Sequence, residues 1–486
     1  MKHKWLTAAV AASLGLAVAG TAGAGTTEPP TDTTEGTTEG ATEGTTEGTT
    51  EGTTEGTTEG TTEGTTEGTT APAVSYPAEI ATDIGVTDDT IKIGMLADLS
   101  GAFAGLVTEI VAAQEVYWDM VNANGGIAGR QIELVIEDNE YNVEVQQQKY
   151  DAIREEVAII SQSTGSPHTA SIAADLVEDD LLAIPLSWYS GWADPDLGQN
   201  VFESYTSYCI ESLNGIEWLA ENRDVTTVAL ISFPGEYGGD GDAGARRAIE
   251  ELGLELVYDG AGQVTPPSGD NPNPDQSGVI SQVVASDADL VWTSINPATL
   301  AGIMAGAVGQ GFDGLWSGNA PSYSFKLLGT EAAPLMDQYY IASAYVSVWG
   351  SDVPGMAAVV EEMTAAQPDL PVSDVYILGW TEAQITHAIL NQAALNGDMT
   401  RAGIVAAGNE VSVDFGGLAP SQTWAGEPDD FIVRESYMYD VSLEAYNPVS
   451  LGEGGGSTGW ELLEGPYTGD LATAYTYEGA CFAPTG

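Results

Sequence analysis

Hydroxyl groups and a predicted helix start come together in one short run of this sequence. Residues 161–167 read SQSTGSP, with Ser166 placed to cap a helix and Pro167 at its first position. The N–H groups of a helix start, together with the hydroxyls of Thr164 and Ser166, suit a carboxylate or a carbonyl oxygen. We therefore expect Thr164, Gly165 and Ser166 to bind a small molecule that carries such a group. The alternative is that these hydroxyls only cap the helix.

Other polar and aromatic residues stand at similar places, directly after predicted strands or in the loops that follow them. These further candidate ligand residues are Ser100, Phe103, Ser187, Trp188, Tyr189, Tyr237, Asn296 and Asn319. Ligands of parallel α/β sheets bind outside the carboxyl ends of the strands, so such loops are expected to meet in one place. The alternative is that the hydroxyls cap helices and the aromatic rings pack between loops.

Catalytic chemistry has little support in this sequence. We find no nucleophile elbow and no grouping of Ser, His and Asp, and three histidines exclude a His-rich metal site. We therefore expect no enzyme activity, no cofactor and no metal ion. Residues 239–244 read GDGDAG and match the dinucleotide fingerprint, between a predicted strand at 227–233 and a predicted helix at 243–252. Asp240 and Asp242 would repel a pyrophosphate, so we assign no nucleotide site.

The stretch 91–139 predicts the elements that position the first of these loops. A short apolar run at 91–96 indicates a strand, and apolar residues then recur with the spacing of one helix face, as at Leu106, Ile110 and Ala113. The glycines of 124–126 end that helix, because glycine adopts the left-handed conformation that a helix end needs. A second strand at 132–136 completes a βαβ unit, which begins a parallel sheet.

The rest of the chain continues this alternation in two series. We predict an α/β fold in which two doubly wound Rossmann-like lobes flank a ligand cleft and are joined by three crossing strands, at 202–207, 339–348 and 431–441. Lobe 1 comprises 82–205 and 345–432, with returning helices at 356–366 and 375–396. Lobe 2 comprises 206–344 and 433–446. Residues 447–486 form a C-terminal extension whose place the sequence does not indicate.

The same stretch closely resembles the start of the solute-binding proteins of branched-chain amino-acid and amide ABC transporters, a periplasmic-binding-protein-like type I family. The residues that carry the resemblance are Ile91-Lys92-Ile93-Gly94, Ser100-Gly101, Asn122-Ala123-Asn124-Gly125-Gly126-Ile127, Gly129 and Asp138, and weaker similarity continues to about Asp440. The resemblance implies that two lobes close on a small-molecule solute and deliver it to the permease of an ABC importer. It also implies that the loops after 157–161 and 181–187 hold the carboxylate of the ligand.

The resemblance also bears on the identity of the ligand. In the amino-acid binders of this family, the loop around Asn319 supplies an acidic residue that pairs with the ligand ammonium. Here the run 317–321 reads SGNAP and has no carboxylate. An unpaired buried ammonium costs several kcal/mol, so an amide, an aromatic compound or a carboxylate fits better than an amino acid. The alternative functions are a ligand sensor that reports to a membrane receptor without transport and, with less support, a secreted enzyme.

The N-terminal region predicts export. Residues 1–24 have the basic start, apolar run and small-residue cleavage site of a signal peptide, and no cysteine near that site supports a lipoprotein. Residues 33–68 repeat Thr-Thr-Glu-Gly and hold no apolar residue large enough to bury, so we expect residues 25–81 to form a disordered linker. We therefore expect an exported protein in the periplasm or at the cell surface.

Charge and cysteine content limit the partners. The formal net charge is −60, which excludes binding to nucleic acid and favours a halophilic surface on a protein that we expect to be a monomer. Cys209 and Cys481 are the only cysteines, and in an exported protein they are expected to form a disulfide. Two separate buried thiols are the alternative.

Overall fold

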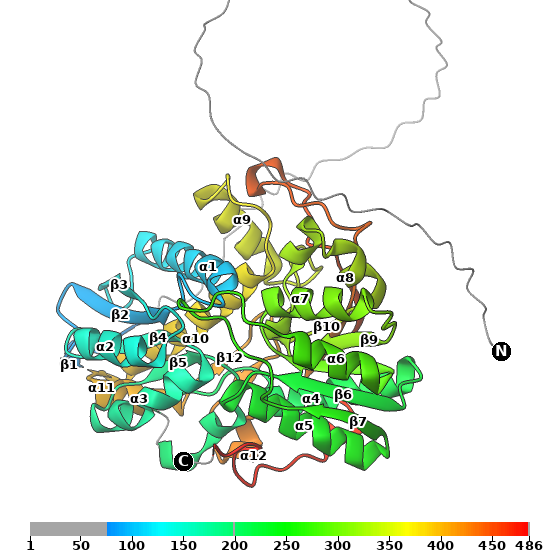
Figure 1. Cartoon of the computed structure of the whole chain (residues 1–486). Helices are drawn as coiled ribbons and strands as arrows, with labels where there is room; N and C mark the ends of the chain where they lie inside the picture. The colour runs from blue at the N-terminus through cyan, green and yellow to red at the C-terminus, as the bar shows by residue number, and fades with distance from the viewer. Residues whose placement is uncertain (1–74, 198–199, 485–486) are drawn as a thin grey trace, which may run out of the picture. The chain divides into compact units, whose positions relative to one another are not determined.

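The computed structural model describes residues 75–197 and 200–484 (Figure 1). The predicted signal peptide and the repeats of the predicted linker lie outside these residues. The last residues of the predicted linker are ordered, which corrects the boundary at residue 81. The Tyr76 hydroxyl donates to Asn391 at 2.6 Å, and β1 (Ala81–Thr82) pairs in parallel with β11 (Asp398–Met399). Within the described residues, no helix is long and apolar enough to cross a membrane.

The first lobe is built on a parallel sheet with the strand order β3-β2-β4-β5. Its strands are β2 (Thr90–Ala97), β3 (Gln131–Asp138), β4 (Ile159–Thr164) and β5 (Ala183–Leu186). The two central strands, β2 and β4, are almost wholly buried, because helices cover both faces of a parallel sheet. These helices are α1 (Ala104–Ala123), α2 (Val143–Ile153) and α3 (Ser166–Glu178), joined later in the chain by α9 (Met356–Ala366), α10 (Val375–Asn396) and α11 (Arg401–Gly408).

The second lobe repeats this arrangement with a parallel sheet of order β7-β6-β8-β9. Its strands are β6 (Thr227–Ser232), β7 (Glu255–Gly260), β8 (Leu290–Ser294) and β9 (Leu315–Gly318), and its helices are α4 (Tyr208–Asn222), α5 (Glu236–Leu252), α6 (Ser277–Ser286), α7 (Pro297–Val308) and α8 (Ala333–Tyr339). Helix α5 begins seven residues earlier than predicted and contains the whole GDGDAG run. That run is therefore not a strand-to-helix loop, and no phosphate-binding turn exists there.

Three antiparallel strands in the order β10-β14-β15 lie beside β9 of the second lobe, where Trp316 bridges to Tyr340: β10 (Ile341–Ala344), β14 (Ser436–Val441) and β15 (Trp460–Tyr467). The segment 202–207, which was predicted to be a crossing strand, is not a strand. It makes only an isolated bridge, from Thr206 to Val433. The remaining short elements are β12 (Ser412–Val413), β13 (Gln422–Thr423), α12 (Pro428–Phe431), α13 (Asp470–Thr473), and the 3-10 turns η1 (Ser190–Ala193), η2 (Pro195–Leu197), η3 (Ala320–Ser322), η4 (Phe325–Gly329) and η5 (Leu451–Glu453).

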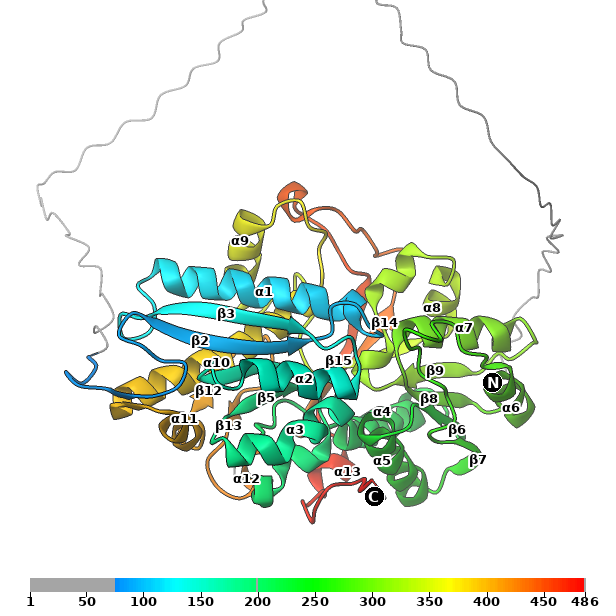
Figure 2. The same cartoon turned by 60° about the vertical axis from the view of Figure 1, so that its left-hand side comes forward.

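The C-terminal extension, for which the sequence indicated no place, contacts both lobes. Its first part hydrogen-bonds to the segment before α10, where the N–H of Leu451 donates to the Leu370 carbonyl at 2.7 Å. It then adds β15 to the sheet of β10 and β14 and packs α13 on α4, as Figure 2 shows. Finally, Cys481 forms a disulfide with Cys209 at the start of α4.

The disulfide gives a first testable prediction. It closes a segment with a sequence separation of 272 residues, for which the chain-entropy model sets an upper limit of about 5.6 kcal/mol. We expect the Cys481→Ser variant to melt several degrees below the wild type. Added reductant should lower the melting temperature of the wild type and leave that of the variant unchanged. A wild-type melt that reductant does not affect, in a protein shown to be reduced, would contradict this expectation.

Candidate ligand-binding site

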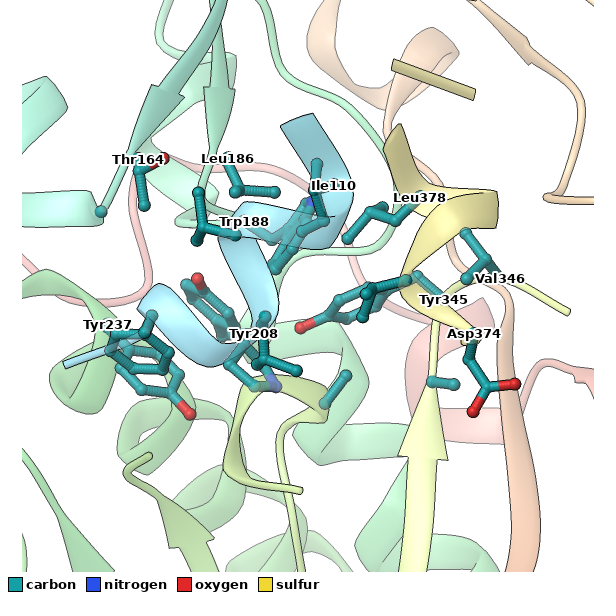
Figure 3. Close-up of a pocket in the computed structure, with 18 of the residues that line it drawn as sticks. Ile110, Thr164, Leu186, Trp188, Tyr208, Tyr237, Tyr345, Val346, Asp374 and Leu378 are labelled. Atoms are coloured by element: carbon teal, nitrogen blue, oxygen red, sulfur yellow. The ribbon is translucent and has the colours of Figure 1, made fainter. Parts of the chain in front are cut away.

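A cavity of about 120 Å³ lies between the two lobes, at the carboxyl ends of their parallel strands (Figure 3). Both lobes, the segment after β10, the start of α10 and the C-terminal extension contribute to its wall. The lining residues are Phe103, Leu106, Val107, Ile110, Tyr141, Thr164, Gly165, Ser166, Leu186, Trp188, Tyr208, Tyr237, Ala320, Pro321, Ala344, Tyr345, Val346, Ser347, Val348, Asp374, Val375, Leu378 and Trp460.

One end of the cavity is formed by the start of α3. Thr164 ends β4, Gly165 turns the chain with a φ of 99°, and Ser166 begins the helix. A side chain at position 165 is excluded, because its Cβ would lie 2.4 Å from His168 Nδ1. The first N–H groups of a helix have no partner within it, so this end presents donors to the cavity.

The hydroxyls at this end are arranged to donate as well. Trp192 Nε1 donates to Ser187 Oγ at 3.1 Å, and Ser187 Oγ lies 2.7 Å from Ser166 Oγ. When the Ser187 hydroxyl donates to Ser166 Oγ, the hydroxyl proton of Ser166 is free to hydrogen-bond to a ligand. Thr164 Oγ1 accepts a hydrogen bond from Gln162 Nε2 at 3.1 Å and keeps its own proton to donate. This donor end therefore suits an acceptor such as a carboxylate.

No Lys, Arg or His belongs to the lining in the described part of the chain. His168 stands in the first turn of α3, but burial lowers its pKa to about 4, so it is neutral at ordinary pH. An anion at this end is stabilised by the positive end of the α3 dipole and by neutral donors.

Aromatic and aliphatic side chains make up most of the remaining wall. Ring centroids lie 4.5 Å apart for Trp188 and Tyr345 and 4.6 Å apart for Tyr208 and Tyr237. One face of α1 (Leu106, Val107, Ile110) and the first turns of α10 (Val375, Leu378) add an aliphatic surface. Such a wall stabilises the apolar body of a ligand through the surface that it removes from water.

The structure brings together part of the predicted site. Phe103, Thr164, Gly165, Ser166, Trp188 and Tyr237 line the cavity. Phe103 is held there because its N–H and that of Gly101 donate to the Asp98 carboxylate. Contact between these residues and a ligand remains a prediction.

The other predicted ligand residues lie outside the lining, and their contact with a ligand also stays a prediction: Ser100, Ser187, Tyr189, Asn296 and Asn319. Ser100 donates to Asp138, Ser187 lies behind Ser166, and the Tyr189 hydroxyl donates to the Phe482 carbonyl at 2.6 Å. The Asn296 side chain caps α7 and donates to the Ala102 carbonyl. Each of these groups is used by a neighbouring part of the protein.

Asn319 is fully buried and connects three elements. Its Oδ1 accepts from Ser294 at 2.6 Å, and its Nδ2 donates to Glu211 Oε2 at 2.8 Å. Glu211, on α4, also accepts from the Ala320 N–H at 2.9 Å and from the Ser343 hydroxyl. The carboxylate missing from 317–321 thus exists behind this loop, where it holds the loop rather than lining the cavity.

Several lining residues were missed by sequence reasoning: Tyr141, Tyr208, Tyr345, Asp374 and Trp460. Tyr345 lies in the segment 339–348, which was predicted to cross between the lobes. That prediction already implied that Tyr345 lies near the cleft. Trp460 lies in the extension, and nothing local in the sequence distinguishes it from the other tryptophans.

Glu211 gives a prediction about pH. Burial raises the pKa of Glu211 to about 7, above its ordinary value of 4.5, although hydrogen bonds from neighbouring groups stabilise the charged form. Between these values the folded state keeps a proton that the unfolded state has released, so the free energy of unfolding falls as pH rises, by up to about 3 kcal/mol for this group. The melting temperature should therefore fall from about pH 5 to about pH 8.

The variant Glu211→Gln separates this contribution from the rest of the protein. Its amide would face the Asn319 amide donor, so the variant should melt lower than the wild type at about pH 5. Its melting temperature should then depend less on pH. A pH dependence as steep as that of the wild type would assign the effect to other groups.

Comparisons with known proteins agree with this architecture. The model of the periplasmic binding protein family matches residues 90–445. A fatty acid ABC transporter substrate-binding protein from Thermomonospora curvata is 25% identical, with a TM-score of 0.73 over 82% of this chain and 97% of that chain. A branched-chain amino acid ABC transporter protein from Thermus thermophilus with bound valine is 18% identical, with a TM-score of 0.66 over 80% and 98%.

A solute-binding protein of an ABC transporter from R. palustris in complex with benzoate is 17% identical, with a TM-score of 0.61 over 75% of this chain and 96% of that chain. No curated protein matches the chain. The two structures under 25% identity show the fold alone, whereas the family model covers most of the folded part. The family consists of proteins that bind solutes and do not turn them over, which agrees with the expectation of no enzyme activity. This chain therefore belongs to the periplasmic binding protein family.

Proposed function

We propose that this protein captures a small solute with a carboxylate and an apolar or aromatic body, and delivers it to the permease of an ABC importer. The observation that carries the proposal is the donor end of the cavity at Thr164 and Ser166, set against an otherwise apolar wall. A helix start binds an anion without a basic residue, and the apolar wall binds the body of the solute.

A free α-amino acid fits this cavity less well. Its ammonium would lie next to its carboxylate, but no carboxylate side chain of the described residues lines the cavity near Thr164 and Ser166. Glu211 already accepts hydrogen bonds from three neighbours, and Asp374 lies on the opposite side of the cavity in Figure 3. An ammonium without an anionic partner loses several kcal/mol of hydration, which favours acids that lack it.

Two of the similar structures support the same ligand class. The protein from Thermomonospora curvata is described as a fatty acid transporter protein, and the one from R. palustris holds benzoate. Both ligands combine a carboxylate with an apolar body and have no ammonium. The protein from Thermus thermophilus holds valine, so the family fold also accepts amino acids.

Contacts across the cleft support binding by closure of the lobes. Asn296 Nδ2 donates to the Ala102 carbonyl at 3.0 Å, and Lys326 Nζ lies 2.9 Å from Glu109 Oε1. Each pair joins a loop or turn of the second lobe to the segment at or within the start of α1. In the proposed cycle these contacts form as the lobes close by a hinge motion, and the permease recognises the closed form.

We further propose that the protein works outside the cytoplasm, is exported by residues 1–24 without a lipid anchor, and acts as a monomer. A sensor that reports to a membrane receptor would bind the same ligand, so binding alone does not separate the two functions. Uptake of labelled ligand by cells that lack this protein separates them. Loss of uptake supports the importer, and unchanged uptake supports the sensor.

A ligand panel tests the proposed class. We expect fatty acids and aromatic carboxylates to raise the melting temperature in high salt, whereas leucine and valine should not. A ligand at a hundred times its dissociation constant adds about 2.7 kcal/mol, which thermal unfolding detects easily. If only leucine or valine raised the melting temperature, the cavity would bind an ammonium group, contrary to our expectation.

The Thr164→Val variant tests the donor end. It keeps the shape of the side chain but removes the hydroxyl proton, so we expect the affinity for a bound carboxylate to fall by up to about tenfold. Thr386→Val is the matched control, because Thr386 is equally buried on α10 and bonds only to its own helix. Equal affinity of the wild type and both variants, measured by calorimetry, would remove Thr164 from the site.

A further inference from the structure

The cavity has a second polar end, opposite the start of α3. Figure 3 shows Thr164 and Asp374 on opposite sides of the cavity, with the ring of Tyr345 between them. The wall around Asp374 consists of the segment after β10, the start of α10 and the C-terminal extension, which contributes Trp460. We call this the distal end.

Asp374 is held firmly at the distal end, but only through one of its two oxygens. Its Oδ1 accepts from the Trp349 N–H at 2.8 Å and from the Thr458 hydroxyl at 2.7 Å. Its Oδ2 is buried and has no hydrogen-bond partner, and the residue is only 7% exposed. An unpaired carboxylate oxygen in such a place costs several kcal/mol, so its position calls for a partner.

Helix capping does not account for Asp374. The residue directly precedes α10, where an aspartate usually accepts from the N–H groups of the first turn. Here the side chain makes no capping hydrogen bond and lines the cavity instead. The fold thus gives up a capping interaction at this helix start.

Two other lining residues at the distal end carry polar atoms without a partner. Ser347 Oγ and Trp460 Nε1 are buried and make no hydrogen bond, and Ser347 is two residues from Trp349, which binds Asp374. The apolar residues Val346, Val375 and Leu378 line the same cavity. A wall with polar atoms at both ends and apolar surface between them matches a ligand of the same pattern.

We propose that the ligand carries a second polar group, a hydroxyl or an amino group, at the end opposite its carboxylate, and that Asp374 accepts a hydrogen bond from it. The ligand class is then an ω-hydroxy or ω-amino carboxylate, and this inference rests on the proposed function. Burial raises the pKa of Asp374 to about 7, and the charge of nearby Glu109 raises it further. A hydrogen bond donated by the ligand stabilises the charged form of Asp374 and lowers this pKa.

The distal end includes residues of the C-terminal extension. Thr458 and Trp460 belong to the C-terminal extension, beyond the family match that ends at residue 445. Thr458 fixes the orientation of Asp374, and the Trp460 ring packs edge-on against Tyr323 and Tyr439. Thr458 is a positioning residue, because it acts on the ligand only through Asp374.

Matched carboxylates test the proposal. For butanoate, hexanoate and octanoate, the plain acid is compared with its ω-hydroxy and ω-amino counterparts by calorimetry on the full protein. At the length that fits best, the wild type should bind the donor-bearing acids at least about tenfold more tightly than the plain acid. In Asp374→Asn, Oδ1 still accepts from Trp349 and Thr458, while an amide donor replaces Oδ2. This variant should lose the preference for the ω-amino acid.

Asp242→Asn is the matched control. Asp242 is also buried and its pKa is also raised to about 7, but it bonds to Ser232 in the second lobe, outside the cavity lining. This control should keep the preference of the wild type. Plain acids that bind as tightly as their donor-bearing counterparts at every length overturn the distal site and leave the proposed function intact. No binding of any carboxylate overturns both.

Discussion

The described residues place no basic side chain in the cavity wall, and this is the constraint on which the candidate site depends. Without Lys or Arg in the lining, an anionic group gains most where the first turn of α3 presents free N–H groups and the hydroxyls of Thr164 and Ser166. Three neighbouring residues maintain the arrangement of these donors. Gly165 brings the chain into the helix without a side chain, Ser187 supports Ser166, and the buried His168 stays neutral.

The second lobe contributes rigidity more than direct contacts. Glu211 and Asn319 join α4, β8, the loop after β9 and β10 through buried hydrogen bonds. A fully satisfied buried network of this kind fixes one arrangement of its members, because any alternative leaves polar groups unpaired. Ala320 and Pro321, which follow Asn319, line the cavity and are positioned by this network.

The C-terminal extension contributes to the candidate site, although the sequence indicated no place for it. It hydrogen-bonds to the segment before α10, adds β15 to the sheet of β10 and β14, and is linked to α4 by the disulfide. It therefore contacts both lobes and supplies Trp460 and Thr458 to the distal end. In the proposed mode of binding, a site closed by such a segment selects its ligand by length and end group as well as by its carboxylate.

The sequence by itself determined the local elements and the general fold. Periodicity placed α9 and α10 at their observed bounds, glycines marked the end of α1, and the SQSTGSP run indicated the helix start that became the donor end. These features depend on neighbours along the chain.

Only the tertiary structure decided which polar groups face the cavity. The amides of Asn296 and Asn319 are used by distant partners, whereas Asp374 and Trp460 meet at the distal end from segments 86 residues apart in the sequence. Hydrogen-bond partners from remote segments decide such cases, because a buried polar group must pair with whatever packing brings to it.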